Sequence, residues 1–107
     1  MNKLQLAINM AINHCVSQKR DTIILVPKSM KTQAYGAFVM GKSEKRWWYM
    51  IGENKLKLQV CALQASGDQH YDTMFIINPH QIECEIALKE AKMIPVAYTG
   101  LTVCVEV

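Results

Sequence analysis

The segment TIILV, residues 22–26, constrains the fold more than any other part of the sequence. A short, continuous run of β-branched and apolar residues fits a strand that is buried on both faces, whereas a strand with one wet face alternates. Pro27 follows at once and ends the run. We therefore expect a β-sheet that holds this strand in its interior.

An amphipathic helix is predicted over residues 3–18, directly before that strand. Apolar side chains recur there at helical spacing, and Gln5, Asn9 and Asn13 fall on the other side. The stripe predicts that the helix covers one face of the sheet. Its members are Leu4, Ala7, Ile8, Ala11, Ile12 and Cys15.

Two further helices are expected. One spans residues 30–40, with Ser29 as a cap and an inner stripe of Met30, Ala34, Ala37 and Phe38. Residues 34–40 also fit a strand.

The other helix begins with Asn78 as the N-cap and Pro79 as the first residue, and it runs to about residue 92. Its expected inner stripe is Cys84, Ala87, Leu88 and Ala91, and Glu85 is expected to pair with Lys89.

Four more strands are predicted, over residues 46–51, 55–63, 73–77 and 96–107, with a polar loop over 64–71. The strand over 55–63 alternates most clearly, since Leu56 and Leu58 face one way and Lys55 and Lys57 the other. The resulting fold class is α+β: one mostly antiparallel sheet with two or three helices packed on it, in the order α-β-α-β-β-β-α-β with the second helix in question. All 107 residues are expected to form a single domain.

Composition narrows the class of protein. Half of the residues are hydrophobic and 20% are charged, which excludes a disordered chain, and no apolar stretch is long enough to cross a membrane. The first residues lack the unbroken apolar core of a secretion signal, so a cytoplasmic location is expected. The four cysteines form no CxxC pair, and we expect reduced, mostly buried thiols at Cys15, Cys61, Cys84 and Cys104.

Two adjacent tryptophans in the predicted strand 46–51 give the strongest functional indication. Neighbouring side chains of a strand point to opposite faces, so Trp47 and Trp48 cannot both enter one core. A three-residue loop would place Trp48 with Leu56 and Leu58, whereas a two- or four-residue loop would place it near Lys57. In either register one tryptophan joins the lysines. The predicted partner-binding residues are Arg46, Trp47, Trp48, Tyr49, Lys55 and Lys57.

Three weaker patterns bear on metal or catalytic chemistry. Cys61, His70, His80 and Cys84 are residue types that bind zinc, but they lack a tight CxxC knuckle. Asp68, His70 and Asp72 form a D-x-H-x-D run in the predicted loop. Asp21 with Glu53 and Lys55 resembles the D…(D/E)xK arrangement of metal-dependent nucleases, although here the ExK falls in a turn. We predict no catalytic residue, no metal site and no cofactor.

The function expected from these features is that of a small, non-enzymatic binding module. Its partner is expected to be a protein or a second copy of the chain, and its size and style resemble inhibitor or adaptor accessory proteins of phages and mobile elements. The net charge of +3 permits the alternative that the same face binds nucleic acid or a nucleotide. A metal-dependent hydrolase or nuclease is a second alternative. No membrane association is expected.

Overall fold

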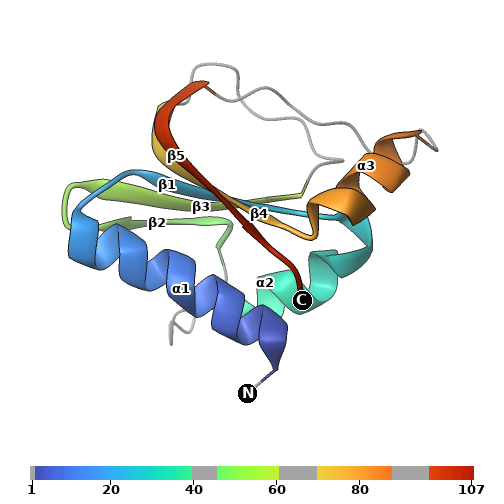
Figure 1. Cartoon of the computed structure of the whole chain (residues 1–107). Coiled ribbons are helices and arrows are strands. Elements are labelled where there is room, and N and C mark those ends of the chain that lie inside the picture. Colours follow the sequence, from blue (N-terminus) through green and yellow to red (C-terminus); the bar gives the residue numbers. More distant parts are fainter. Residues whose placement is uncertain (1, 40–45, 61–69, 88–96) are drawn as a thin grey trace.

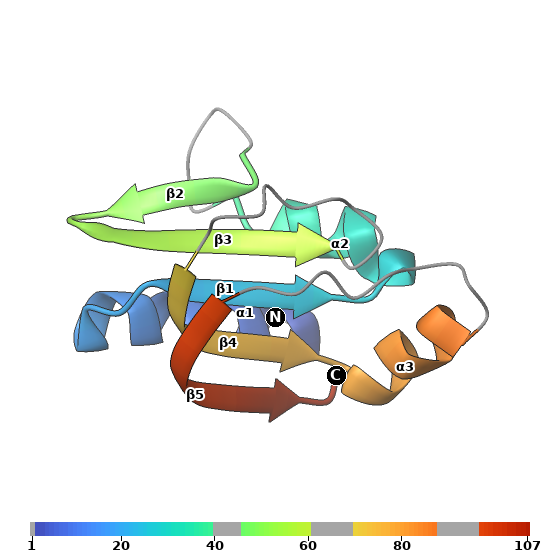
Figure 2. The same cartoon turned by 90° about the horizontal axis from the view of Figure 1, so that it is seen from above.

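The protein folds as a mixed five-stranded sheet with helices on both faces (Figures 1 and 2). The architecture is seen in a computed structural model that describes residues 2–39, 46–60, 70–87 and 97–107. The described elements are α1 (Lys3–Gln18), β1 (Thr22–Val26), the 3-10 turn η1 (Lys28–Met30), α2 (Lys31–Ala37), β2 (Trp48–Ile51), β3 (Asn54–Val60), β4 (His70–Ile77), α3 (Pro79–Ala87) and β5 (Ala97–Val105).

The strand order is β2-β3-β1-β4-β5, which places β1 in the middle of the sheet. The expectation of an interior strand at TIILV is confirmed, since all five residues are buried. The α+β class is also confirmed, but the prediction that the sheet is mostly antiparallel is wrong. The pairs β1–β3, β1–β4 and β4–β5 are parallel, and β2–β3 is the one antiparallel pair among the described strands. A strand buried on both faces is typical of parallel sheets, so the signal was present in β1.

Connection handedness explains why helices cover both faces. The chain passes from β1 to its neighbour β3 through α2, and from β4 to its neighbour β5 through α3. In the strand order, the first connection moves toward β2 and the second moves toward the opposite edge. Crossovers between parallel strands are almost always right-handed. Opposite directions therefore place the connecting helices on opposite faces, with α2 beside α1 on one face and α3 on the other (Figures 1 and 2).

The two faces carry separate cores. On the face of α1 and α2, here the α1 face, the buried cluster joins the helix stripe to Ile24, Leu56, Leu58 and Phe75. On the face of α3, here the α3 face, the cluster is smaller and consists of Ile23, Leu25, Tyr71, Met74 and Ile82. Because side chains alternate along β1, this one strand contributes to both cores.

The helix predictions have mixed outcomes. The helix over 3–18 is confirmed with its bounds and its buried stripe, and Asn2 caps it through Oδ1, which accepts from the amide nitrogen of Gln5 at 2.8 Å. Residues 31–37 are helical, which decides against the strand alternative there. The inner stripe predicted for α3 is wrong at Cys84 and Ala87, which are exposed; Ile82 and Glu85 are the buried residues instead. The residues Leu88 and Ala91 lie outside the described part of the chain, as does Lys89.

Strand bounds differ from the predictions by one to three residues. β2 begins at Trp48 and β3 begins at Asn54, so the hairpin loop consists of Gly52 and Glu53. Gly52 has a φ of 62°, a conformation that glycine adopts without strain. β4 begins at His70, so Tyr71 belongs to a strand and is buried, rather than part of a polar loop. Residues 61–69, which include Cys61 and Asp68, lie outside the described ranges.

Candidate functional site

The register of the β2–β3 hairpin decides which tryptophan faces the lysines. The pairs are Trp48 with Lys57, Tyr49 with Leu56, and Met50 with Lys55. This is the two-residue-loop register, so Trp48 and Met50 point to the α3 face together with the lysines. Trp48 is 50% exposed and Met50 is 52% exposed, which is unusual for side chains of this size in a sheet.

The other aromatic residues of the hairpin belong to the fold. The ring of Trp47 stacks on Tyr35 of α2, with centroids 4.3 Å apart and an interplanar angle of 15°. Tyr49 is buried beside Phe38, and its hydroxyl donates to the carbonyl of Val39 at 3.1 Å. Of the six predicted partner-binding residues, Trp47 and Tyr49 therefore pack on the α1 face. Arg46 is exposed just before β2.

A shallow cavity of about 250 Å³ lies on the α3 face of the hairpin. It is lined by Trp48, Lys55, Lys57 and Tyr71, and we call it the hairpin pocket. Tyr71 forms a buried wall and is only 2% exposed, and the Nζ of Lys55 lies 5.1 Å from the centroid of its ring. Trp48 is thus the aromatic surface that a partner can reach, and the two lysines place positive charge beside it.

Partial burial and neighbouring charges shift the pKa values of two residues in the hairpin pocket. The pKa of Lys57 is lowered, first because partial burial disfavours the charged ammonium and second because Lys55 carries a like charge nearby. Burial, together with the carboxylate of Asp21, raises the pKa of Tyr71 to about 12, so this phenol stays neutral at ordinary pH. An anion bound at the pocket would offset the repulsion between the lysines.

Asp21 fixes the position of Lys55 relative to the sheet. Its Oδ1 accepts from the amide nitrogen of Lys55 at 2.9 Å, and its carbonyl accepts from the amides of Asp72 and Thr73 at 2.9 and 3.1 Å. The amide of Asp21 donates to Oδ2 of Asp72 at 3.3 Å. These hydrogen bonds join the beginnings of β1, β3 and β4, so the backbone of Lys55 is held in place by its neighbouring strands.

A polar cluster that the sequence did not predict lies at the opposite, carboxyl end of the parallel strands. At its centre is Glu85 of α3, which is 7% exposed. Its Oε2 accepts from the amide of Lys28 at 2.7 Å, and its Oε1 accepts from the amide and Oγ of Ser29 at 3.2 and 2.7 Å. Burial alone would raise the pKa of Glu85, but these hydrogen bonds outweigh it and the pKa is lowered. Gln81 also donates to Ser29, and Asn78 bonds Val107. The available signal was the i, i+3 spacing of Ile82 and Glu85, which places both on one face of the helix.

That end of a parallel sheet is where α/β proteins commonly bind ligands. In this chain the carboxylate of Glu85 already occupies the backbone amides of Lys28 and Ser29. Asn78 adopts a φ of 48° and ties the chain between β4 and α3 to the end of β5, since its amide donates to the carbonyl of Val105 at 2.8 Å. The cluster therefore holds α3 and β5 in place.

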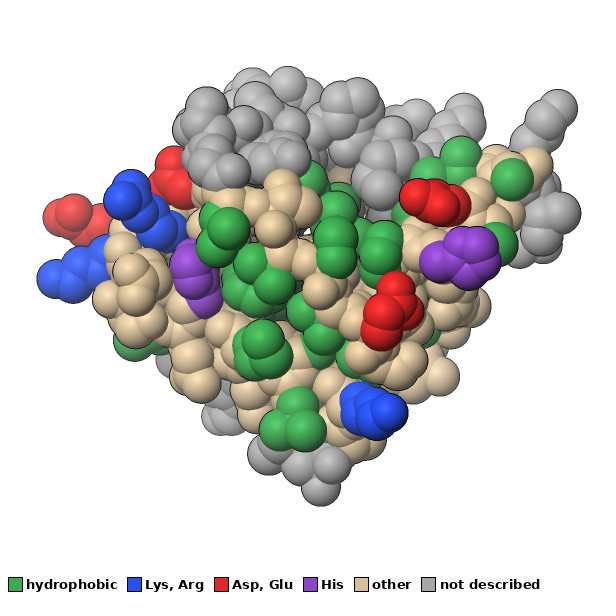
Figure 3. All heavy atoms as spheres, viewed as in Figure 1, with side chains coloured by type: hydrophobic (Ala, Val, Ile, Leu, Met, Phe, Trp, Pro, Cys, Tyr) green, Lys and Arg blue, Asp and Glu red, His purple; other side chains and the backbone are tan. Residues whose placement is uncertain are grey.

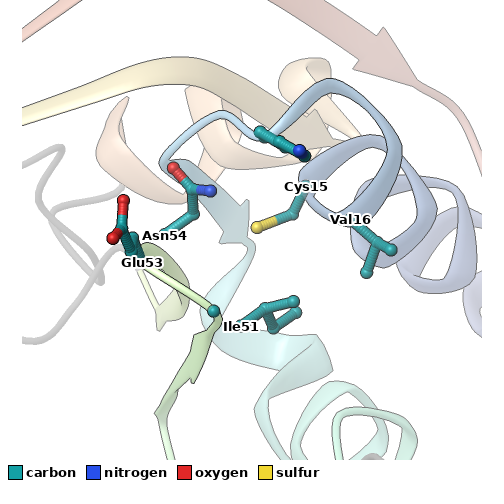
Figure 4. A pocket seen from close by; sticks show the side chains of 7 residues that line it. Cys15, Val16, Ile51, Glu53 and Asn54 are labelled. Atoms are coloured by element: carbon teal, nitrogen blue, oxygen red, sulfur yellow. The ribbon is translucent and has the colours of Figure 1, made fainter.

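A second cavity, of about 340 Å³, lies between the end of α1 and the β2–β3 turn (Figure 4). The sulfur of Cys15 points into this space, and it donates to the carbonyl of Lys55 at 3.7 Å. Burial raises the pKa of the Cys15 thiol, which keeps it protonated and weakly reactive. The prediction of a buried thiol is confirmed for Cys15, whereas Cys84 and Cys104 are exposed.

The structure brings together only some of the residues in the possible metal-binding patterns of the sequence. His80 and Cys84 do share a face of α3, with Nε2 and Sγ 3.7 Å apart, and Nδ1 of His80 lies 3.9 Å from Glu83. Within the described ranges, no three side chains of His, Cys, Asp or Glu gather as a metal site would require. Glu53 lies exposed in the hairpin turn, while Asp21 and Asp72 accept backbone amides.

The molecule has other exposed apolar side chains. Leu6 and Met10 of α1 and Leu101 of β5 are each about half exposed, and Figure 3 shows hydrophobic side chains over this side of the molecule. In the part of the chain that the structure describes, no helix is long and apolar enough to cross a membrane.

No protein-family model matches this chain, and no curated protein or solved structure matches it either.

Proposed function

We propose that this chain is a small, non-enzymatic binding module that recognises its partner with the hairpin pocket. The observation that carries the proposal is the exposed ring of Trp48 placed directly across from Lys57, with Lys55 on the same face. Trp is among the residues that dominate the energetics of recognition surfaces, and the two lysines add positive charge beside its ring. The partner accordingly presents negative charge beside a flat or apolar group.

Support for a binding role also comes from how the pocket is built. The ring of Trp48 is half exposed, whereas Tyr49 of the same hairpin is buried in the core and Trp47 is partly buried against it. Asp21 holds Lys55 by its backbone amide, which leaves the position of the ammonium group to side-chain contacts such as the ring of Tyr71. A braced hairpin reduces the entropy that is lost on binding.

A capture experiment with matched variants tests the proposal. Immobilised wild type, Trp48→Ser and Leu6→Ser are incubated with extract of the source cells, and bound protein and nucleic acid are both analysed. Leu6 is the control because it is as exposed as Trp48 but lies on α1. We expect a partner that is retained by wild type and Leu6→Ser and lost by Trp48→Ser. Retention of the same partners by all three proteins would contradict the proposal.

A further inference from the structure

We infer that the partner of the hairpin pocket is single-stranded nucleic acid, with a base stacked on Trp48 and phosphates at Lys55 and Lys57. The inference rests on the proposed function and names the chemistry of its ligand.

The pocket combines the two elements that such a ligand needs. Single-stranded nucleic acid is held by aromatic platforms for its bases and by positive charge along its backbone. Trp48 supplies an accessible platform, while Tyr71 is buried and Lys55 already lies over its ring. A cavity of about 250 Å³ offers room for one stacked base rather than for a folded element of a protein.

The lysines are arranged in a row rather than as an isolated charge. Lys55 and Lys57 are two residues apart on β3, so their backbone positions are separated by about 6.8 Å along one face of the strand. Successive phosphates of an extended strand can follow such a row. The described residues that line the pocket include two lysines and no carboxylate, while Asp21, whose charge acts on Tyr71, accepts from the backbone amide of Lys55.

An acidic peptide is the competing ligand, and two observations favour nucleic acid over it. A peptide gains from pockets that enclose its apolar side chains, but the accessible aromatic surface of this pocket is one flat ring. Burial and then the like charge of Lys55 lower the pKa of Lys57 in the unbound protein, and closely spaced phosphates relieve the repulsion between the two lysines.

Fluorescence anisotropy with defined probes tests the inference. The probes are labelled 15-mers of oligothymidylate and oligouridylate, and polyglutamate and heparin of similar charge are the competitors. We expect both oligonucleotides to bind at low salt, with Trp48→Ser weakening affinity by about 5- to 150-fold. The logarithmic salt slope should become less steep by about 0.7 in Lys57→Glu, since one phosphate contact is lost.

Two control variants separate a specific site from general attraction. Lys3→Glu changes the net charge as Lys57→Glu does, but it lies at the start of α1, and we expect much weaker effects. Leu6→Ser should bind as wild type does. Circular dichroism of each variant verifies that it is folded.

Three outcomes would overturn the inference: no oligonucleotide binding at low salt, equal effects of Lys3→Glu and Lys57→Glu, or full displacement by polyglutamate with Trp48→Ser unaffected. If oligonucleotides fail while a protein captured from extract still depends on Trp48, the ligand class is wrong and the proposed function stands. If neither depends on Trp48, both are wrong.

Discussion

In the part of the chain that the structure describes, the two faces of the sheet carry buried clusters of different size. On the α1 face, α1 and α2 cover β1, β3 and β4, and one buried cluster joins Leu4 of α1 to Phe75 of β4 (Figure 1). On the α3 face, α3 packs with Ile82 against a smaller apolar cluster. The hairpin on that same face presents Trp48, Lys55 and Lys57.

The difference separates residues that fold the protein from residues that are available for recognition. Leu56 and Lys57 are neighbours on β3, yet one is fully buried and the other lines an open cavity. Trp47, directly before β2, stacks on Tyr35 of α2, whereas Trp48 at the start of β2 is half exposed in the hairpin pocket. The comparison predicts that substitutions on the α1 face reduce stability, whereas substitutions in the hairpin pocket reduce binding.

The largest loss of stability is expected from Leu58→Ala on the α1 face. Leu58 is 1% exposed, so the substitution leaves a cavity and should lower the free energy of unfolding by about 2–5 kcal/mol. Urea denaturation followed by circular dichroism measures the change. Leu6→Ala is the matched control, because Leu6 is exposed and its replacement should change stability by less than about 0.5 kcal/mol. Equal effects of the two substitutions would break the comparison.

The next largest loss is expected from Glu85→Ala, which removes the acceptor of the Lys28 and Ser29 amides. Buried donors left without a partner typically cost about 1–3 kcal/mol, and the same denaturation assay measures this.

Acid also tests the role of Glu85. Because the pKa of folded Glu85 lies below the ordinary 4.5, its contribution is complete above pH 4.5 and is lost as the pH falls through the folded pKa. Wild type should therefore lose more stability than Glu85→Gln between about pH 6 and about pH 3. Identical acid profiles of the two proteins would rule out a stabilising carboxylate at this position.

A smaller, alkaline effect is expected at Tyr71 on the α3 face. Its pKa is raised to about 12, so between pH 10 and 12 the unfolded chain loses the phenolic proton while the folded protein retains it. Stability therefore falls with rising pH in this window, and Tyr71→Phe should fall less steeply. Ultraviolet titration of the phenolate, run beside the denaturation series, checks the assignment. A Tyr71 that ionises at the ordinary pKa of 10.0 would disprove it.

A smaller loss of stability than that of Leu58→Ala, about 1 kcal/mol, is expected from Trp48→Ser. Trp48 is 50% exposed, so about half of its surface is buried, whereas Leu58 is almost fully buried. Thermal unfolding monitored by circular dichroism provides the measurement. A loss comparable to that of Leu58→Ala would show that Trp48 belongs to the core.

The local elements could be predicted from sequence because their signals are local. The stripe of α1 and the five-residue run of β1 each contain the periodicity that determines their burial, and both were located with their bounds. Likewise, alternation in β3 and the pleat of β2 required that one tryptophan share a face with the lysines.

Pairing between distant strands could not be predicted in the same way. Which strands neighbour β1 depends on crossovers that no local pattern records, so the sheet was expected to be antiparallel. Glu85 was expected to pair with Lys89 from their i, i+4 spacing, whereas the amides that it accepts belong to Lys28 and Ser29 of η1 and reach it through tertiary packing. The hairpin register also stayed open, since either loop length suits the sequence around Gly52.

Quenching of single tryptophans by acrylamide tests the central claim most directly. Trp47→Phe leaves Trp48 as the emitting ring, and Trp48→Phe leaves Trp47. In the unbound protein, Trp48 should be quenched readily and Trp47, stacked on Tyr35, much less. Addition of an oligothymidylate 15-mer should then shield Trp48 and leave Trp47 unchanged. A Trp48 that is shielded in the unbound protein, or whose quenching no ligand alters, would contradict a recognition site at the hairpin pocket.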